Sequence, residues 1–230
     1  MFVFAHLVCG LLLGLIFCSI IHDRRAIPVC IVSSLLPDLV DKPFALLIPA
    51  LSSGRTIFHS LLILLIVAII ALVILRNRYF LWGIAVASCI FVHQVLDAMW
   101  LLPVSWAFPL LGPFPLLATP DYTGYYLRLE ITSLSEWVYL LVTVVLLIGI
   151  FSPGPGIHKR RHFLRVMTTA LVAGMGIFMT VSGVLGAGNT FFAPSYSDLT
   201  TGMAGILALA AAAVMLQWHR IYPLKKDPGK

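Results

Sequence analysis

The stretch FVFAHLVCGLLLGLIFCSII, residues 2–21, determines which class of fold this chain adopts. Only His6 and Ser19 interrupt its apolar side chains. A helix of about 20 apolar residues is long enough to cross the hydrocarbon core of a bilayer. The stretch therefore predicts a transmembrane helix, and the charged run from His22 to Arg25 predicts where that helix leaves the membrane.

This first apolar stretch differs from a secretory signal peptide in three ways. No basic residue precedes it, no small-x-small cleavage site stands before Asp23, and His6 interrupts its apolar core. We therefore expect it to stay in the protein as an uncleaved first span.

The composition extends the membrane prediction to the whole chain. Hydrophobic residues make up 60% of the 230 residues, charged residues make up 10%, and the mean hydropathy is +1.03. Soluble domains are about a quarter charged, so this chain could not cover its apolar surface in water. The 15 basic residues lie in short clusters rather than in a stripe interleaved with aromatic residues. This distribution argues against nucleic acid as a partner.

Further apolar runs predict an all-α fold, a polytopic transmembrane helical bundle of about six to seven spans. Clear candidates are Ile57–Leu75, Phe80–Leu102, Glu136–Phe151, Phe163–Leu185 and Thr201–Trp218. The second run, Ala26–Leu39, is short because Pro37 and Pro43 stand at its end, so we expect a short or tilted crossing there. The segment from Pro103 to Asp121 holds five prolines and is expected to be an irregular outer loop.

The basic clusters predict the orientation of the chain. Cytoplasmic loops of membrane proteins carry an excess of Lys and Arg. We therefore place in the cytoplasm Arg24 with Arg25, Arg76 with Arg78, Lys159 to Arg161 with Arg165, and Arg220 with Lys225 and Lys226. Seven crossings satisfy this assignment in an inner (cytoplasmic) membrane, with the N-terminus outside and the C-terminus in the cytoplasm.

Two regions are expected within one structural unit. Residues 1–135 form an N-terminal membrane region that carries the candidate site and the irregular outer loop. Residues 136–230 form a three-span scaffold with a basic tail. Glu130 and Glu136, on the outer side, are expected to approach the site, or else Glu130 is expected to pair with Arg128 or to face water.

Six ionisable side chains lie in or beside the predicted spans of the first region. An ionisable group inside a membrane is costly and is a candidate functional residue by default. The predicted topology brings all six to the outer leaflet, although they are scattered over some ninety residues: His6, Asp38, Asp41, His59, His93 and Asp97.

The residue types and spacings of this set predict a metal site. His93 and Asp97 are four residues apart and project from one helix face. Asp38 and Asp41 are three residues apart, on a helix or on a turn between Pro37 and Pro43. Imidazole and carboxylate together suit a divalent ion, with zinc as the first choice and manganese or iron as alternatives.

Each residue also has a structural interpretation. His6 could be interfacial, and His93 with Asp97 could hydrogen-bond two helices together. Asp38 and Lys42 could form a simple ion pair. The set as a whole could therefore belong to a metal or small-solute transporter or binding protein, or to a non-catalytic membrane interaction module.

Four motifs occur in order along the first half of the chain: His6 in an apolar helix, Leu36-Pro37-Asp38-Leu39-Val40-Asp41-Lys42, Phe58-His59-Ser60-Leu61 and His93-Gln94-Val95-Leu96-Asp97. In this series, and in the loop Trp106-Ala107-Phe108-Pro109-Leu110 after it, the chain resembles the YdjM-type family. The resemblance implies a LexA-regulated inner-membrane protein that is a metal-dependent hydrolase. Lys42 departs from the family pattern, in which His often follows the second Asp.

The expected activity is metal-dependent hydrolysis of a phospholipid or a lipid-linked phosphoester at the extracytoplasmic interface. Asp38, Asp41 and Arg55 are the expected catalytic residues, and Lys42 with Arg55 would hold an anionic head group. Membrane lipids and a lipid-like substrate are the expected partners, and the sequence predicts no oligomeric state. The loop with Trp106 is expected to form a lid or an interfacial anchor.

Overall fold

The computed structural model describes residues 3–48, 54–74, 79–115, 121–151, 158–188 and 197–217, and every regular element in these ranges is a helix. The α-helices are α1 (Val3–Ile21), α2 (Ala26–Leu47), α3 (Leu61–Ile69), α4 (Phe80–Leu96), α5 (Pro103–Trp106), α6 (Tyr122–Thr132), α7 (Leu134–Phe151), α8 (His158–Val184) and α10 (Asp198–Leu216). A 3-10 turn, η2 (Ile57–His59), precedes α3, and a π-helical turn, η3 (Ile70–Ile74), follows it. A second 3-10 turn, η5 (Met99–Leu101), connects α4 to α5.

Helix length and composition confirm the predicted class of fold. Three helical stretches are long and apolar enough to cross a membrane, Val3–Ile21, Phe163–Val184 and Asp198–Leu216, and Leu61–Val73, Phe80–Leu96 and Leu134–Ile150 are shorter apolar helices. The chain is thus an all-α membrane bundle. Several basic residues behind the predicted orientation, namely Arg76, Arg78, Arg220, Lys225 and Lys226, lie outside the described residues.

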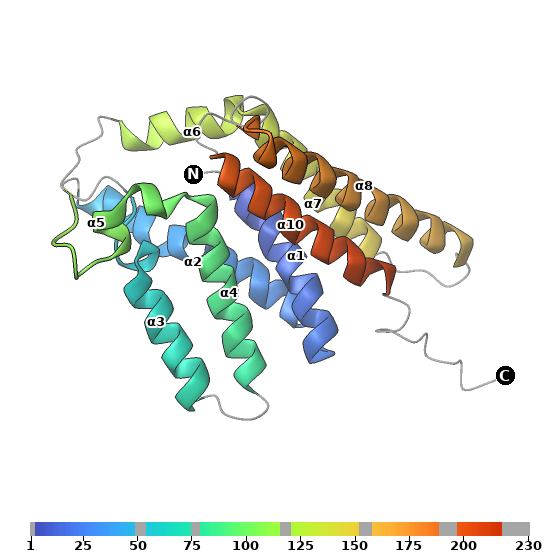
Figure 1. The fold of residues 1–230 in the computed structure, drawn as a ribbon, viewed down its shortest axis with the longest axis horizontal. Coiled ribbons are helices and arrows are strands. Elements are labelled where there is room, and N and C mark those ends of the chain that lie inside the picture. The colour runs from blue at the N-terminus through green and yellow to red at the C-terminus, as the bar shows by residue number, and fades with distance from the viewer. Residues whose placement is uncertain are drawn as a thin grey trace.

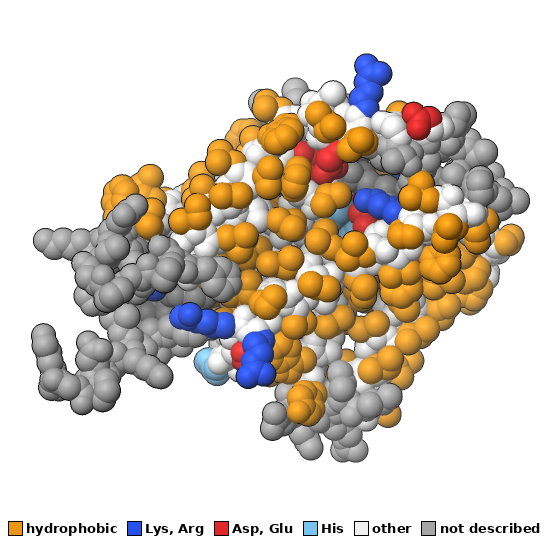
Figure 2. All heavy atoms as spheres, turned by 180° about the vertical axis from the view of Figure 1, so that it is seen from behind, with side chains coloured by type: hydrophobic (Ala, Val, Ile, Leu, Met, Phe, Trp, Pro, Cys, Tyr) orange, Lys and Arg blue, Asp and Glu red, His pale blue; other side chains and the backbone are white. Residues whose placement is uncertain are grey.

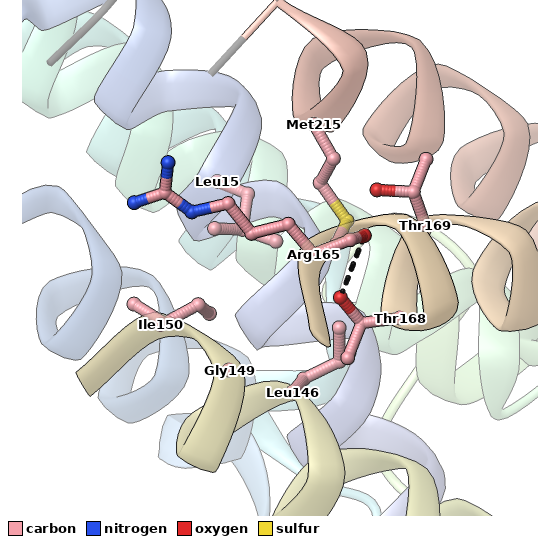
Figure 3. Close-up of a pocket in the computed structure, with 8 residues that line it drawn as sticks. All are labelled: Leu15, Leu146, Gly149, Ile150, Arg165, Thr168, Thr169 and Met215. Atoms are coloured by element: carbon pink, nitrogen blue, oxygen red, sulfur yellow. Dashed lines mark hydrogen bonds between the residues drawn. The ribbon is translucent and has the colours of Figure 1, made fainter. Parts of the chain in front are cut away.

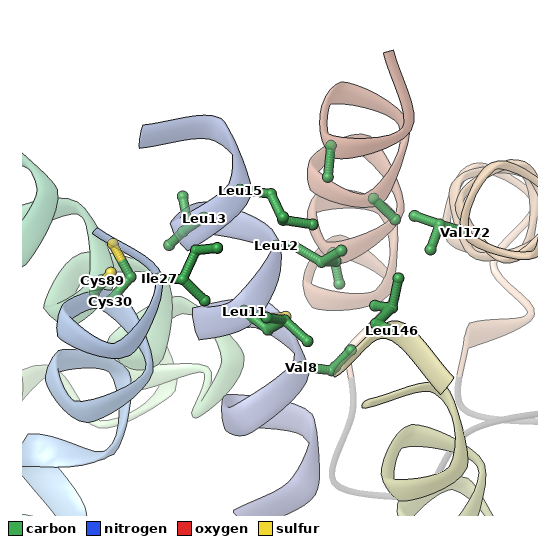
Figure 4. Packing of buried hydrophobic residues seen from close by; sticks show 14 of the residues in the cluster. Val8, Leu11, Leu12, Leu13, Leu15, Ile27, Cys30, Cys89, Leu146 and Val172 are labelled. Carbon is green, nitrogen blue, oxygen red and sulfur yellow. The ribbon is translucent and has the colours of Figure 1, made fainter. Parts of the chain in front are cut away.

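The first helix occupies the centre of the bundle. Helix α1 packs against α2 and α4 on one side and against α7 and α10 on the other (Figure 1). Helix α8 packs against α10 and α7, and α3 packs against α4. Figure 4 shows Leu11, Leu12 and Leu15 of α1 pointing toward neighbouring helices on several sides. These leucines are fully buried, so α1 holds the two halves of the bundle together.

The small residues of α1 allow α2 to approach it closely. A Cβ atom added at Gly14 would lie 2.8 Å from the Cα atom of Ile27, which is closer than real Cβ contacts. A Cβ atom added at Gly10 would overlap the Ser34 hydroxyl oxygen. Small residues at helix interfaces let backbones approach in a membrane, where van der Waals packing replaces the hydrophobic effect. Glycine at these two positions therefore fixes the separation of α1 and α2.

Helix α2 differs from the prediction. The sequence predicted a short span that ends near Leu39, but α2 continues through Pro37 and Pro43 to Leu47. A proline inside a helix removes one hydrogen bond and crowds the preceding turn. Packing of α2 against α1 and α4 offsets this cost. Asp38, Asp41 and Lys42 consequently lie on a helix rather than on a turn or a loop.

The segment after α4, which was predicted to be an irregular outer loop, contains more helix than predicted. Helix α4 ends at Leu96 rather than at Leu102, and Asp97 is its C-terminal capping residue. The next residue, Ala98, has a left-handed backbone with φ of 49°, which turns the chain away from the helix axis. Pro103–Trp106 forms the short helix α5, and Tyr122–Thr132 forms α6 within the predicted outer loop.

A small cavity lies among α1, α7, α8 and α10, toward the C-terminal end of α1. Figure 3 shows the residues that line it, and its volume is about 20 Å³, roughly the room for one water molecule. The Thr168 hydroxyl already donates to the carbonyl oxygens of Leu164 and Arg165. None of the six predicted metal residues lines this cavity, so it is separate from the candidate site.

Candidate metal centre

Two imidazoles and two carboxylates from three parts of the chain gather at one end of the bundle. Asp38 comes from α2, His59 from η2, His93 from the last turn of α4, and Asp97 from its C-terminal cap. Each residue offers one potential ligand atom, and these four atoms all lie within 4.8 Å of one another. All four residues are buried. This group could hold a metal ion.

Asp41 fixes the position and orientation of His59. Its Oδ2 atom accepts hydrogen bonds from the backbone N–H groups of Thr56 and His59, at 2.8 and 3.2 Å. Its Oδ1 atom accepts from the N–H of Phe58 at 3.3 Å. The Nδ1 atom of His59 lies 2.8 Å from Asp41 Oδ2. Asp41 thus holds the η2 turn through its backbone and the His59 ring through Nδ1.

Ser34 plays the corresponding part for His93. The Nδ1 atom of His93 lies 2.7 Å from the backbone carbonyl oxygen of Ser34. The Ser34 hydroxyl in turn donates to the carbonyl oxygen of His6, at 2.9 Å. One residue of α2 therefore connects α4 to α1 beside the site. The sequence motifs gave Ser34 no role, because a serine in an apolar helix has no distinguishing pattern.

These contacts determine the tautomers of both histidines. A carboxylate and a carbonyl oxygen can only accept hydrogen bonds, so Nδ1 of His59 and Nδ1 of His93 must each carry a hydrogen. In the neutral rings, Nε2 of each histidine then carries no hydrogen and has an unshared lone pair. These two Nε2 atoms face each other at 3.1 Å. A positive charge, either a proton or a metal ion, is required between them.

The two carboxylates supply further donor atoms for a metal ion in that place. His59 Nε2 lies 3.6 Å from Asp38 Oδ1 and 3.5 Å from Asp97 Oδ2, and His93 Nε2 lies 3.9 Å from Asp38 Oδ1. Ligands at about 2.0–2.2 Å from a tetrahedral ion are about 3.3 Å apart. Asp38 Oδ1 is buried and has no hydrogen-bond partner in the described part of the chain. The donor set therefore fits a divalent ion.

His6 contacts this group from α1. Its Nε2 atom lies 3.2 Å from Asp97 Oδ1, and its ring stacks on that of His93 with centroids 3.9 Å apart. Its Nδ1 atom is buried without a hydrogen-bond partner among the described residues. Of the six predicted metal residues, the structure thus brings four together as potential ligands. It places His6 and Asp41 directly behind them.

Two cations stand at the edge of the site. Lys42 Nζ lies 2.7 Å from Asp38 Oδ2, and Arg55 Nε lies 3.0 Å from Asp97 Oδ2. Their side chains are 27% and 22% exposed, whereas the two carboxylates are 6% and 3% exposed. In Figure 2, hydrophobic side chains cover most of the face, and charged and histidine side chains gather in a few places. The cations therefore lie between the buried ligands and the surroundings.

Two glutamates fix the end of α1 that carries His6. Glu136 Oε2 accepts from the N–H groups of Phe4 and Ala5, at 2.9 and 3.3 Å, and Glu130 Oε1 accepts from the N–H of Val3 at 2.9 Å. The first N–H groups of a helix have no partner within the helix and favour negative charge. Glu136 is fully buried. Both glutamates thus approach the site region through α1 rather than by contact with the ligands.

A model of a known family matches most of the chain. The family model of the YdjM inner membrane protein matches residues 1–187. The chain belongs to the YdjM family. No curated protein and no solved structure matches the chain.

The YdjM match contains the complete site. All four potential ligands, His6, Asp41 and both glutamates lie within residues 1–187, whereas α10 lies beyond them. Membership of the YdjM family also supports a location in the membrane, in agreement with the apolar helices.

Proposed function

We propose that this YdjM family member is a metal-dependent hydrolase of a phospholipid or a lipid-linked phosphoester, with its site at the extracytoplasmic face. The observation that carries the proposal is the pair of Nε2 lone pairs that face each other at 3.1 Å beside two buried carboxylates. In a bound state, a divalent ion supplies an activated water with a pKa of about 7 and polarises a phosphoryl oxygen.

The ligand assignment follows from the hydrogen bonds. We assign Asp38, His59, His93 and Asp97 as ligands, with zinc as the first choice of ion. His6 and Asp41 are positioning residues in this proposal, because His6 holds Asp97 and both oxygens of Asp41 already accept hydrogen bonds. Partners of this kind orient ligands and are as important to metal sites as the ligands themselves.

The residues around the ion suit a phosphoester. Asp38 Oδ1, which has no hydrogen-bond partner among the described residues, would bind the ion next to the attacking water. Lys42 and Arg55 are partly exposed and can turn toward an anionic phosphate, for which guanidinium and ammonium groups are suited. The apolar helices beside the site would accommodate the lipid chains.

A transporter or a non-catalytic interaction module uses buried polar groups differently. Where buried polar side chains serve only to hold helices together, their polar atoms have hydrogen-bond partners. Here Asp38 Oδ1 is left without a hydrogen-bond partner within the described ranges, although it lies 3.6 and 3.9 Å from the Nε2 atoms of His59 and His93. This supports an ion site with a chemical role over a structural polar network.

Metal analysis of the purified full-length protein tests the ion site. We expect about one tightly bound divalent ion per chain, and loss of that ion in His93→Ala and Asp38→Asn. His22→Asn is the matched control, because His22 is exposed at the other end of α1 and should not affect the metal content. Full metal occupancy in both site variants would refute the ligand assignment.

Activity is tested with vesicles that contain phospholipids or a lipid-linked pyrophosphate. We expect release of a phosphorylated head group or of inorganic phosphate by the metal-loaded protein, and at least a hundred-fold loss of rate in Asp38→Asn. Hydrolysis by wild type and Asp38→Asn at equal rates would contradict the catalytic assignment.

A further inference from the structure

The amide of Gln94 connects three segments around the candidate metal centre. Gln94 follows His93 on α4 and is completely buried. Its Nε2 atom donates to the carbonyl oxygen of Ser60 at 3.0 Å and to that of Phe58 at 3.5 Å. These two carbonyl groups belong to the residues on either side of His59. The side chain next to one potential ligand therefore holds the backbone around the other.

The other end of the amide reaches the outer segment. Trp106, the last residue of α5, donates from Nε1 to Gln94 Oε1 at 3.0 Å. An indole nitrogen can only donate, and carbonyl oxygens can only accept, so these partners fix which way the amide faces. Three of its four hydrogen-bonding positions are used, and rotation of the amide by 180° would break all three bonds.

The segment held in this way is the exposed part of the site region. Beyond Trp106 the chain continues through Phe108, which stacks on Phe114 with ring centroids 4.1 Å apart. The tip between these rings carries Leu110 and Leu111, which are 87% and 57% exposed. Gln94 thus connects the backbone around His59 to a segment whose apolar tip suits the lipid interface.

We propose that Gln94 is a positioning residue that couples the ion site to the α5 segment. Ion binding fixes His59 and its flanking carbonyl groups, which fixes the amide and, through it, the Trp106 indole. The coupling is reciprocal, because any effect of the ion on Trp106 requires an equal effect of Trp106 on ion affinity. This inference rests on the metal site of the proposed function and assigns it a response at the membrane surface.

The test uses zinc titrations of the full-length protein in detergent, followed by chelator competition and by tryptophan fluorescence. Zinc should change the emission of wild type, and the change should disappear in Trp106→Phe, which identifies its source among the five tryptophans. Gln94→Met, which keeps the length of the side chain but removes both hydrogen-bonding groups, should lose the Trp106 signal. It should also bind zinc about ten-fold or more weakly.

Two further variants separate coupling from loss of stability. Thr168→Val removes a buried hydroxyl at the cavity near the other end of α1 and should leave zinc affinity and the Trp106 signal unchanged. Trp106→Phe should weaken zinc binding several-fold by reciprocity, which keeps the test decisive if Gln94→Met does not fold. Wild-type affinity in Trp106→Phe, or a wild-type signal and affinity in Gln94→Met, would overturn the coupling. Wild-type protein that binds no zinc would instead overturn the metal site itself.

Discussion

The buried carboxylate of Asp41 accepts four hydrogen bonds, three from backbone N–H groups and one from His59. A buried carboxylate requires such compensation, because it has lost its water. The same bonds place a hydrogen on Nδ1 of His59 and direct its Nε2 lone pair into the site. One side chain therefore shapes the η2 turn and prepares a ligand.

Replacing Asp41 with asparagine weakens this support. Oδ2 accepts from the backbone of Thr56 and His59 and from Nδ1 of His59, and Oδ1 accepts from Phe58. The one amide oxygen of Asp41→Asn can replace only one of these two atoms, so the NH₂ group must face an N–H donor, and the negative charge beside Nδ1 of His59 is lost. We expect zinc affinity to fall by about 10–100-fold while the helical circular dichroism spectrum stays unchanged. Asp23→Asn, in the turn after α1, is the control and should bind zinc like wild type. Unchanged affinity in Asp41→Asn would show that His59 needs no orienting carboxylate.

Sequence reasoning could identify the residues of the site but not the part each plays. A histidine or an aspartate in an apolar segment is conspicuous, and the four potential ligands were all predicted. The distinction between ligand and positioning residue depends on which atoms face which, and this is decided by packing. Ser34 and Gln94 were not predicted to act at the site, because uncharged polar residues are common in membrane helices.

At the scale of elements, the contact between α1 and α2 sets the geometry of the site. Gly10 of α1 faces Ser34 of α2, and the Ser34 carbonyl holds His93 of α4. A displacement of α2 from α1 would therefore move a histidine on a third helix. Interiors packed at crystal-like density transmit such displacements rather than absorb them.

The glycine contact gives a prediction about metal binding from a residue that touches no ligand. In Gly10→Ala, the added methyl group must displace the Ser34 side chain, so we expect weaker zinc binding and a lower melting temperature. Gly174→Ala on α8 is the matched control, because a Cβ atom there would meet nothing within 4 Å. The control should match or exceed wild-type stability, since alanine favours helix. Equal zinc affinity in both variants would argue against control of His93 by the α1–α2 contact.

The helices were predictable from apolar run length, while their ends and interruptions were less so. Runs such as Glu136–Phe151 correspond to an observed helix, α7, within two residues at its start. The continuation of α2 through two prolines was not predictable from local preference, because tertiary packing offsets the local cost. The end of α4 at Asp97 depends on the left-handed backbone of Ala98, a conformation that no local pattern predicts for alanine.

For the whole molecule, the two ends of α1 differ in chemistry. His6 contacts the candidate metal centre, whereas Arg24 and Arg25 follow the other end of the helix. Fifteen residues of helix separate His6 from Ile21, a rise of about 22 Å. This is a large part of the roughly 30 Å hydrocarbon core, so we expect the site and the basic turn to belong to opposite faces of the membrane.

Cysteine labelling tests this orientation directly. Leu110→Cys, on the exposed tip beyond α5, should react with a maleimide that cannot cross the inner membrane. Arg24→Cys should react only after the membrane is permeabilised, as the positive-inside rule requires. The four native cysteines are all buried and provide an unlabelled background. Labelling of Arg24→Cys alone in intact cells would place the site on the cytoplasmic side.

The central place of α1 has a consequence for how the protein is made. All four potential ligands have been synthesised by residue 97, yet α1 is still missing the helices that cover its other side. Glu136 must arrive to bind its first N–H groups, and α10, the last described helix, must then pack along it. Thr200 of α10 donates to the carbonyl oxygen of Val95, two residues before Asp97, at 3.3 Å. Helix α1 is thus synthesised before the helices that enclose it, and in our proposal loading of the ion should be a late step in biogenesis.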